Sequence, residues 1–375
     1  MKRYFLGMAA TYRGRDVLRH LFAMGRKKHC DKLCAYLKER YEGDAILCKN
    51  GRSALAIALK SYFEPGDAVI VNGFTCYAVY EAVQAAGLVP IFADITKEDL
   101  NFDINTLEAA IKSRQVKVAQ DKIKGIIIQN SLGNPVSVVS IEQFADKHGL
   151  TIIEDLAHCA GVKYPDGREC GTVGAAAAFS FGKDKVIDTI SGGAVVLRAP
   201  VKHRIKAPSK LPKFSDHLRA RFYPLYGWTC RKLTFLHLGG VLMKILVAIH
   251  FVEKSADNRL DLKRRISKFE AKLALKQFKN LRKSGELPIR EFCFVKERDT
   301  VLKKLAKAGF YFDGLWYKQP VSPERYYKKL GFPEHDCPTA VSVAEHVINF
   351  PNYYRRSDLM PAIDIVREYL WEEEK

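Results

Sequence analysis

Residues 151–197, TIIEDLAHCAGVKYPDGRECGTVGAAAAFSFGKDKVIDTISGGAVVL, decide the fold that the sequence predicts. The stretch holds three apolar segments, each short enough to be a buried strand. Asp155 closes the first segment, Ser180 lies at the end of the second, and Lys185 follows shortly after it. Ligands of α/β proteins bind at the carboxyl ends of the strands. We therefore expect a carboxylate, a hydroxyl and an amine to meet at one edge of a sheet.

The elements outside this stretch predict the same architecture. Near-continuous apolar runs alternate with segments of helical periodicity, which indicates a mostly parallel sheet of about seven strands covered by helices on both faces. From Pro288 onward, short alternating strands and a helix predict a smaller α+β unit. We predict an N-terminal helical segment (1–45), a large α/β domain (46–197), a basic and apolar insertion (198–257), an interdomain helix (258–287) and a C-terminal domain (288–375).

An amine and a carboxylate at one sheet edge fit the chemistry of pyridoxal 5′-phosphate (PLP). A lysine amine can bond to the aldehyde of PLP, and a carboxylate can keep its pyridine nitrogen protonated. Each residue alone has a simpler interpretation, because an acid after a strand is commonly a turn or a helix cap and a lysine is commonly solvated. The combination of Asp155, Ser180 and Lys185 favours the PLP interpretation.

A wider set of residues carries a resemblance to a known family. Asp155-x-Ala157-His158, then Phe179-Ser180-Phe181-x-x-x-Lys185, then Gly192-Gly193 resembles the DegT/DnrJ/StrS nucleotide-sugar aminotransferases. The resemblance implies PLP as cofactor and fold type I, the aspartate aminotransferase fold. It also implies a homodimer with shared active sites that moves an amino group from an amino acid, glutamate in our prediction, to a keto sugar carried on a nucleotide. Such a reaction serves polysaccharide biosynthesis.

The same resemblance implies where the cofactor phosphate binds. Gly51, Arg52 and Ser53 begin a helix, and backbone N–H groups at a helix start suit a phosphate. An ordinary N-cap is the alternative that spacing alone leaves open. Arg52 stands where the family has threonine, so a charged contact would replace a hydroxyl contact. Ser180 is expected on the same phosphate. Lys263 falls on the family asparagine that reaches the phosphate of the partner subunit.

The residues expected around the cofactor ring depart from the family in two places. Asp155 is predicted to hold the pyridine nitrogen and His158 to orient the ring oxygen or Asp155, although a satisfied core histidine is equally compatible. The family has a stacking aromatic ring where this chain has Cys76, so the stacking is lost or Tyr77 provides it. Asn130 replaces a family histidine and is expected near the cofactor, with a plain turn as the alternative. Lys185 is predicted to move the proton as base and acid. A family histidine is Ser322 here, which leaves substrate recognition open.

Residues 198–252 have no counterpart of similar length in the family. Ten lysines and arginines stand against one acid in residues 198–232, interleaved with aromatic residues, and a long apolar run follows. His237 and Lys244 interrupt that run, which disfavours a membrane span. Two interpretations remain: a helix lying in the interface of an anionic membrane, or a buried helix that covers the dimer or the substrate entrance.

The net charge of +19 favours anionic partners: a nucleotide diphosphate, an anionic membrane surface or nucleic acid. No nucleic-acid-binding motif supports the third, and the nine cysteines show no CxxC spacing, so no metal site is expected. Without an apolar secretory core near Met1, a cytoplasmic protein, peripheral at the inner face of the membrane, is expected. A non-catalytic regulatory or membrane-associated PLP-fold protein, and a PLP enzyme with another substrate, are the competing predictions.

Overall fold

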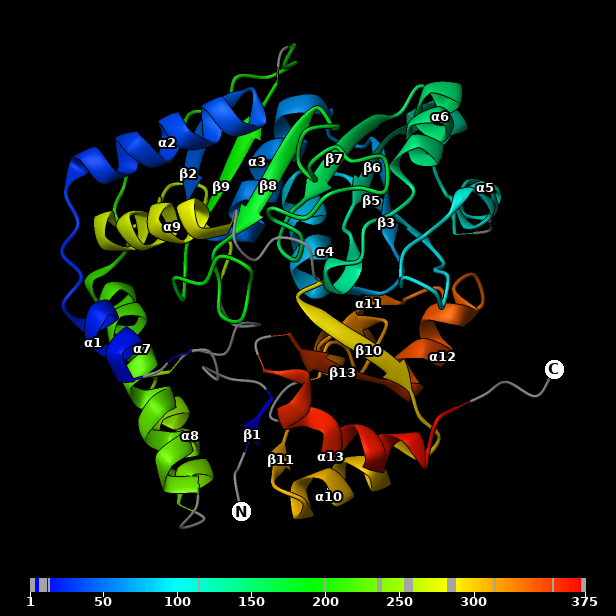
Figure 1. The fold of residues 1–375 in the computed structure, drawn as a ribbon. Coiled ribbons are helices and arrows are strands. Elements are labelled where there is room, and N and C mark those ends of the chain that lie inside the picture. The colour runs from blue at the N-terminus through cyan, green and yellow to red at the C-terminus, as the bar shows by residue number, and fades with distance from the viewer. Residues whose placement is uncertain are drawn as a thin grey trace.

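The computed structural model describes residues 4–6, 12, 14–113, 115–198, 200–234, 238–252, 259–281, 288–312, 315–352 and 354–371. A seven-stranded sheet of order β2-β9-β8-β7-β6-β3-β5 lies at its centre (Figure 1). Six of its strands run in the same direction, and β9, which lies between β8 and β2, runs antiparallel to both of these neighbours. The strands are β2 (Asp44–Cys48), β3 (Ala68–Asn72), β5 (Val89–Ala93), β6 (Ile123–Ile128), β7 (Thr151–Asp155), β8 (Ala176–Ser180) and β9 (Gly193–Leu197).

The apolar strands are buried because helices cover both faces of the sheet. Alternate residues of one strand enter two different apolar clusters: Ile126 and Ile128 belong to one, and Ile127 to the other. The mostly parallel α/β architecture predicted from the sequence is therefore confirmed. The helices of the first cluster are α2 (Lys27–Tyr41), α5 (Ile104–Lys112), α6 (Val138–His148) and α9 (Lys268–Asn280), and those of the second include α3 (Gly51–Tyr62) and α4 (Tyr77–Ala85).

The N-terminal segment is helical, as expected, but in two pieces. Helix α1 (Gly14–Leu21) is separated from α2 by a short connection that contains Gly25. A Cβ at Gly25 would lie 2.0 Å from the backbone carbonyl carbon of Lys268, so the chain can cross the start of α9 here only with a glycine. The break between the two helices is thus a close crossing of two backbones.

The C-terminal residues form small sheets with an apolar cluster of their own. The strand β12 (Val321–Ser322) pairs in parallel with β4 (Thr75–Cys76), which brings the chain around residue 316 beside the loop after β3. The other elements are β1 (Tyr4–Phe5), β10 (Arg290–Phe294), α10 (Arg298–Lys307), β11 (Phe310–Tyr311), α11 (Glu324–Leu330), α12 (Pro338–His346), β13 (Val347–Pro351) and α13 (Arg356–Arg367); two short 3₁₀ turns are Gln120–Lys122 and Ser131–Gly133.

The long insertion forms two helices, α7 (Phe214–Leu233) and α8 (Gly239–Ala248). They extend down one side of the molecule, and α7 packs against both α1 and α8 (Figure 1). Within the described ranges, no helix combines the length and the apolar composition that a membrane crossing requires. The predicted interruption at His237 lies outside the described residues.

Candidate active site

A cavity of about 370 Å³ opens at the carboxyl ends of β7 and β8. The sheet edge supplies one wall, the start of α3 a second, and residues of the C-terminal part and of α7 the rest. The structure thus brings together most of the side chains that the sequence singled out. Those that line the cavity are Gly51, Arg52, Cys76, Asp155, His158, Ser180 and Lys185.

Lys185 and His158 form a direct pair in this cavity. The Lys185 Nζ atom lies 2.9 Å from His158 Nε2. On its other side, His158 Nδ1 accepts the backbone N–H of Leu132 at 3.2 Å. A neutral imidazole that accepts at Nδ1 carries its proton on Nε2. His158 therefore donates to the Lys185 amine, which can accept only in its neutral form.

The electrostatics of the pair agree with this assignment. Burial lowers the pKa of Lys185, although Cys76 and Asp155 partly oppose the shift. Burial, followed by the charges of Lys185 and Arg290, holds the pKa of His158 well below 6.5. Each group disfavours the positive charge of the other, so both are neutral more readily than they would be in water. A neutral buried amine is the form that can attack a carbonyl.

Asp155 ends β7 and lies in the same cavity. One carboxylate oxygen, Oδ1, accepts the backbone N–H of Ala157 at 3.0 Å, which fixes the rotamer of the side chain. Burial raises the pKa of Asp155, while the N–H of Ala157 and the charge of Lys185 act against that shift. A carboxylate held in this way is suited to a protonated ring nitrogen.

The start of α3 and the end of β8 meet closely enough to form a cradle. A Cβ at Gly51 would lie 2.6 Å from Ser180 Cβ, so only glycine permits this approach. The first turn of α3 and the Ser180 hydroxyl therefore face the same space, as phosphate binding at a helix start requires. Arg52 lines the cavity as well, but its Nη1 lies 2.5 Å from Glu81 Oε2. An anion would share this guanidinium with Glu81.

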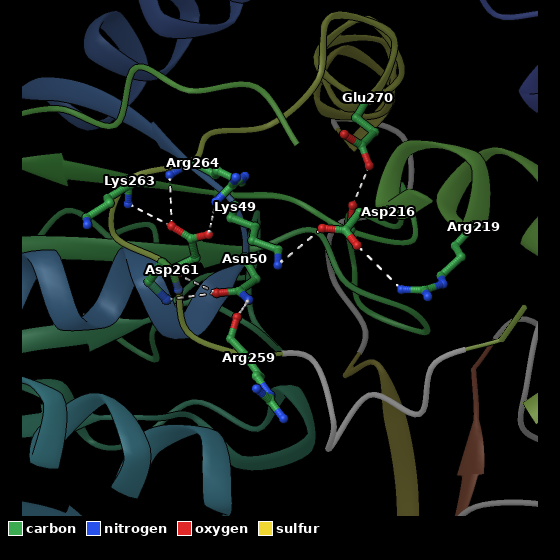
Figure 2. A network of polar contacts seen from close by, with 11 residues as sticks. Lys49, Asn50, Asp216, Arg219, Arg259, Asp261, Lys263, Arg264 and Glu270 are labelled. Atoms are coloured by element: carbon green, nitrogen blue, oxygen red, sulfur yellow. Dashed lines mark hydrogen bonds and ion pairs between the residues drawn. The ribbon is translucent and has the colours of Figure 1, made fainter. Parts of the chain in front are cut away.

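A polar network fixes the start of α3 in place, and Figure 2 shows it from close by. Asn50 caps the helix by accepting the backbone N–H of Ser53, and its Nδ2 donates to the carbonyl of Arg259. The Ser53 hydroxyl accepts the backbone N–H of Asp261 at 3.0 Å. Ser53 therefore ties the 259–264 segment to α3 and is not among the residues that line the cavity. Its predicted role as a phosphate ligand stays a prediction.

The same network contains the backbone of Lys263, whose N–H donates to Asp261 Oδ1. The Lys263 side chain is exposed and is not among the residues that line the cavity of its own subunit. This placement leaves its predicted contact with a partner subunit untested.

Two further predicted residues lie outside the cavity. The ring of Tyr77 stacks on that of Tyr326 with centroids 3.9 Å apart, because residue 77 begins α4 and points away from the sheet edge. Asn130 is buried behind the site, where its side chain donates to the hydroxyl of Tyr164 and accepts the N–H of Val136. The predicted cofactor contacts of both residues stay predictions. For Asn130 the turn interpretation fits.

The sequence reasoning missed an aromatic wall from the C-terminal part. The ring of Trp316 stacks on that of His158 with centroids 4.9 Å apart, and Lys185 Nζ lies 4.5 Å from the centre of the Trp316 ring. Tyr317 lines the cavity beside it, and its hydroxyl lies 3.4 Å from His158 Nε2. The adjacent aromatic residues were visible in the sequence. Only the β12–β4 pairing shows that they reach the site.

The insertion also contributes to the cavity, through Ala220 and Tyr223 of α7 and through Phe251 and Val252 after α8. Lys183 Nζ lies 4.2 Å from the centre of the Tyr223 ring, so α7 contacts the loop that carries Lys185. Helix α7 thus covers the entrance of the cavity, which is part of one of the two interpretations of the insertion.

Comparison with protein families gives one match over more than half of the chain. Residues 19–213 match the model of the DegT/DnrJ/EryC1/StrS aminotransferase family. The matched segment contains Gly51, Asp155, Ser180 and Lys185, and it ends one residue before α7.

Curated relatives match over up to half of the chain. A pleiotropic regulatory protein of Geobacillus stearothermophilus is 31% identical over 50% of this chain and 48% of its own length. A UDP-N-acetyl-3-dehydro-alpha-D-glucosamine 3-aminotransferase of Acidithiobacillus ferrooxidans is 35% identical over 40% of this chain and 39% of its own. The chain thus spans less than half the length of these relatives.

Solved structures match over nearly the whole chain. A DegT/DnrJ/EryC1/StrS aminotransferase from Brucella abortus has a TM-score of 0.65 at 21% identity, covering 94% of both chains. DesV of S. venezuelae has a TM-score of 0.66 at 23% identity, covering 94% of this chain and 92% of its own. At these identities the likeness establishes the fold, including the C-terminal part.

Proposed function

Because the chain belongs to the DegT/DnrJ/EryC1/StrS aminotransferase family, we propose that it is a PLP-dependent aminotransferase acting on a keto sugar carried on a nucleotide. The amino donor in this proposal is an amino acid, glutamate first among those to be tested, and the product serves the synthesis of a surface polysaccharide. The observation that carries the proposal is the Lys185 amine, 2.9 Å from His158 Nε2 in one cavity with Asp155 and the Gly51–Ser180 cradle.

The residues present fit PLP by their chemistry. Lys185 offers an amine for the aldehyde, Asp155 a carboxylate for the pyridine nitrogen, and Ser180 with the first turn of α3 a cradle for the phosphate. PLP, when bound, supplies an electron sink that weakens the bonds at the amino-bearing carbon of the substrate.

Side chains of the protein itself would carry out the proton transfers. The Lys185 amine would take a proton from the substrate carbon and return it, since burial and His158 favour its neutral form. His158 Nε2 keeps the amine in place between these steps. Trp316, stacked on His158, closes one side of the cavity and excludes water from it.

We propose a homodimer as the working form, in the cytoplasm, with the exposed Lys263 reaching the partner's phosphate site. Support comes from the position of Lys263 on the network that joins the 259–264 segment to α3. The cationic residues at the cavity rim, Lys49 and Arg219 among them, suit the diphosphate of a nucleotide sugar.

The test is an absorbance titration of the purified protein with PLP, followed by excess glutamate. We expect a cofactor band distinct from that of free PLP, which glutamate converts to the amino form, and neither change in Lys185→Ala. If the wild type and Lys185→Ala give the same spectra, the catalytic proposal is wrong. The non-catalytic, regulatory alternative would then apply.

A further inference from the structure

Helices α1, α7 and α8 form an arm beside the main body of the molecule (Figure 1). Its small core contains Val17 of α1, Ala220 and Tyr223 of α7, and Val252 after α8. The arm is therefore packed internally and has a defined outer surface. We call this unit the arm, with residues 14–24, 211–234 and 238–252.

Helix α8 is apolar on both of its faces. Met243, Leu246 and Val247 pack against the core of the arm. Leu238, Val241, Ile245 and Ile249 recur at intervals of three and four residues, so they form one stripe, and they are 51–55% exposed. A helix that is apolar all round is normally covered on every side. The exposed apolar stripe therefore indicates a surface that binds a partner.

The apolar exposure is concentrated on the arm as a whole. Phe22 and Phe214 are 72% and 77% exposed, and exposed apolar side chains that gather in one region mark an interaction surface. Most of the large exposed hydrophobic residues that the structure describes lie there: Leu18, Phe22, Met24, Leu211, Phe214, Leu218, Leu238, Val241, Ile245, Ile249 and Phe251. Among the described residues away from the arm, the exposed large hydrophobic residues are only Ile104, Val139, Met360 and Leu370.

The charge around these residues is predominantly positive, with Asp16 of α1 and Asp216 of α7 as the acids within the arm. Residues 198–252 contain a single acid, Asp216, and it is already paired with Lys49 and Arg219. Lys244 lies at the edge of the α8 stripe, where a long side chain can extend its amine toward a polar boundary. The exposed cations on the arm and in the sequence directly next to it are Arg15, Arg19, Arg26, Lys27, Lys28, Lys210, Lys213, Lys232 and Lys244.

The positive charge of the arm indicates which kind of partner binds this surface. A second copy of the arm would place cations against cations, which is unfavourable. An anionic bilayer offers apolar chains for the stripe and negative headgroups for the lysines and arginines. The ten residues of α8 are about 15 Å long, far short of a hydrocarbon core of about 30 Å, so the helix would lie in the interface.

We propose that the arm docks on an anionic lipid bilayer, with the α8 stripe in the boundary between headgroups and acyl chains. Ala220, Tyr223, Phe251 and Val252 belong to the arm and also line the cavity, so docking brings the entrance of the site to the membrane surface. This inference rests on the arm alone. It holds whether or not the aminotransferase reaction is the one proposed above.

The experiment is flotation of the full chain with vesicles of pure phosphatidylcholine or of phosphatidylcholine with phosphatidylglycerol. We expect binding to the anionic vesicles only, weakened by salt. The double variant Ile245→Asp/Ile249→Asp should reduce the partition coefficient by at least about tenfold, since two apolar side chains then cannot enter the interface. Val139→Asp, an exposed apolar residue of α6 away from the arm, is the matched control and should bind as the wild type does.

Two results would overturn the proposal. One is equal binding of the wild type and the double variant to anionic vesicles. The other is loss of a dimer in the double variant, measured by light scattering, with no vesicle preference in the wild type; a second copy would then be the occupant. Both changed side chains are exposed, so the variant should keep its thermal unfolding curve and its PLP titration. Those controls separate failure of docking from failure of the proposed function.

Discussion

The carboxyl edge of the central sheet and the arm use apolar sequence in opposite ways. At the sheet edge, buried strands deliver single polar groups, Asp155 and Ser180, to one cavity. In the arm, apolar residues of α8 remain at the surface with cations around them. The comparison teaches that burial decides what an apolar run does: a buried run positions chemistry at its end, and an exposed run is itself the interaction surface.

The largest effect is expected at the sheet edge. Asp155→Asn removes the charge that would stabilise a protonated ring nitrogen but keeps the shape of the side chain. We expect the half-reaction with glutamate to slow by about 10²–10³-fold. Single-turnover absorbance measures this rate. A variant within twofold of the wild type would remove Asp155 from the site.

The arm should respond to acid through His20. Its Nε2 lies 3.1 Å from the carbonyl oxygen of Ala220, and burial lowers its pKa to about 4. An unfolded histidine binds its proton below about pH 6.5, so the unfolded state gains protons first as pH falls. Between pH 7 and pH 5 this should cost about 2 kcal/mol of stability. Urea unfolding at both pH values should show a smaller loss in His20→Gln; an identical loss would contradict the assignment.

The Lys185–His158 pair predicts a change in pH dependence. His158→Leu removes the donor that favours the neutral amine, so the pKa of Lys185 should rise. PLP binding needs the neutral amine, so the rising part of its rate–pH profile should shift by about one pH unit toward higher pH. At pH 7 the variant should therefore bind PLP about tenfold more slowly than the wild type. Stopped-flow absorbance across pH measures this profile. If the rising part of the rate–pH profile stays where it is in the wild type, or shifts toward lower pH, then His158 does not act on the amine.

The smallest effects distinguish the aromatic residues. Trp316→Leu removes a ring in contact with His158 and Lys185 and should weaken PLP binding about fivefold. Tyr77→Leu is the matched control, because its ring faces Tyr326, and should change the PLP dissociation constant by less than about twofold. If Tyr77→Leu weakened PLP binding more than Trp316→Leu does, the Tyr77 ring would have to turn toward the cofactor when PLP binds. Equilibrium PLP titrations measure both.

Much of the fold and the centre of the site could be predicted because their signals are local. Asp155, Ser180 and Lys185 stand at or just past strand ends, and the parallel sheet alone then places them together. Trp316 could not be placed in this way, because a pairing between β12 and β4 from distant parts of the chain brings it to the site. The contacts of Asn130 with Tyr164 and of Tyr77 with Tyr326 could not be predicted, because position in a loop does not determine side-chain direction.

The arm shows the limit of periodicity. Apart from interruptions such as Lys244, the run from Leu233 to Val252 is apolar throughout, so its hydrophobic periodicity does not indicate which face of a helix is buried. Only the packing of Met243 and Leu246 against α7 shows that the stripe through Ile245 is the outer face.

The most direct test of the central claim is to map the residue that holds PLP. Borohydride reduction of the PLP-loaded protein fixes the cofactor on the lysine that carries it, and peptide mass spectrometry then identifies that lysine. We predict a single modified site at Lys185. Modification of the neighbouring Lys183, whose amine faces the Tyr223 ring, or no modification at all, would contradict the account.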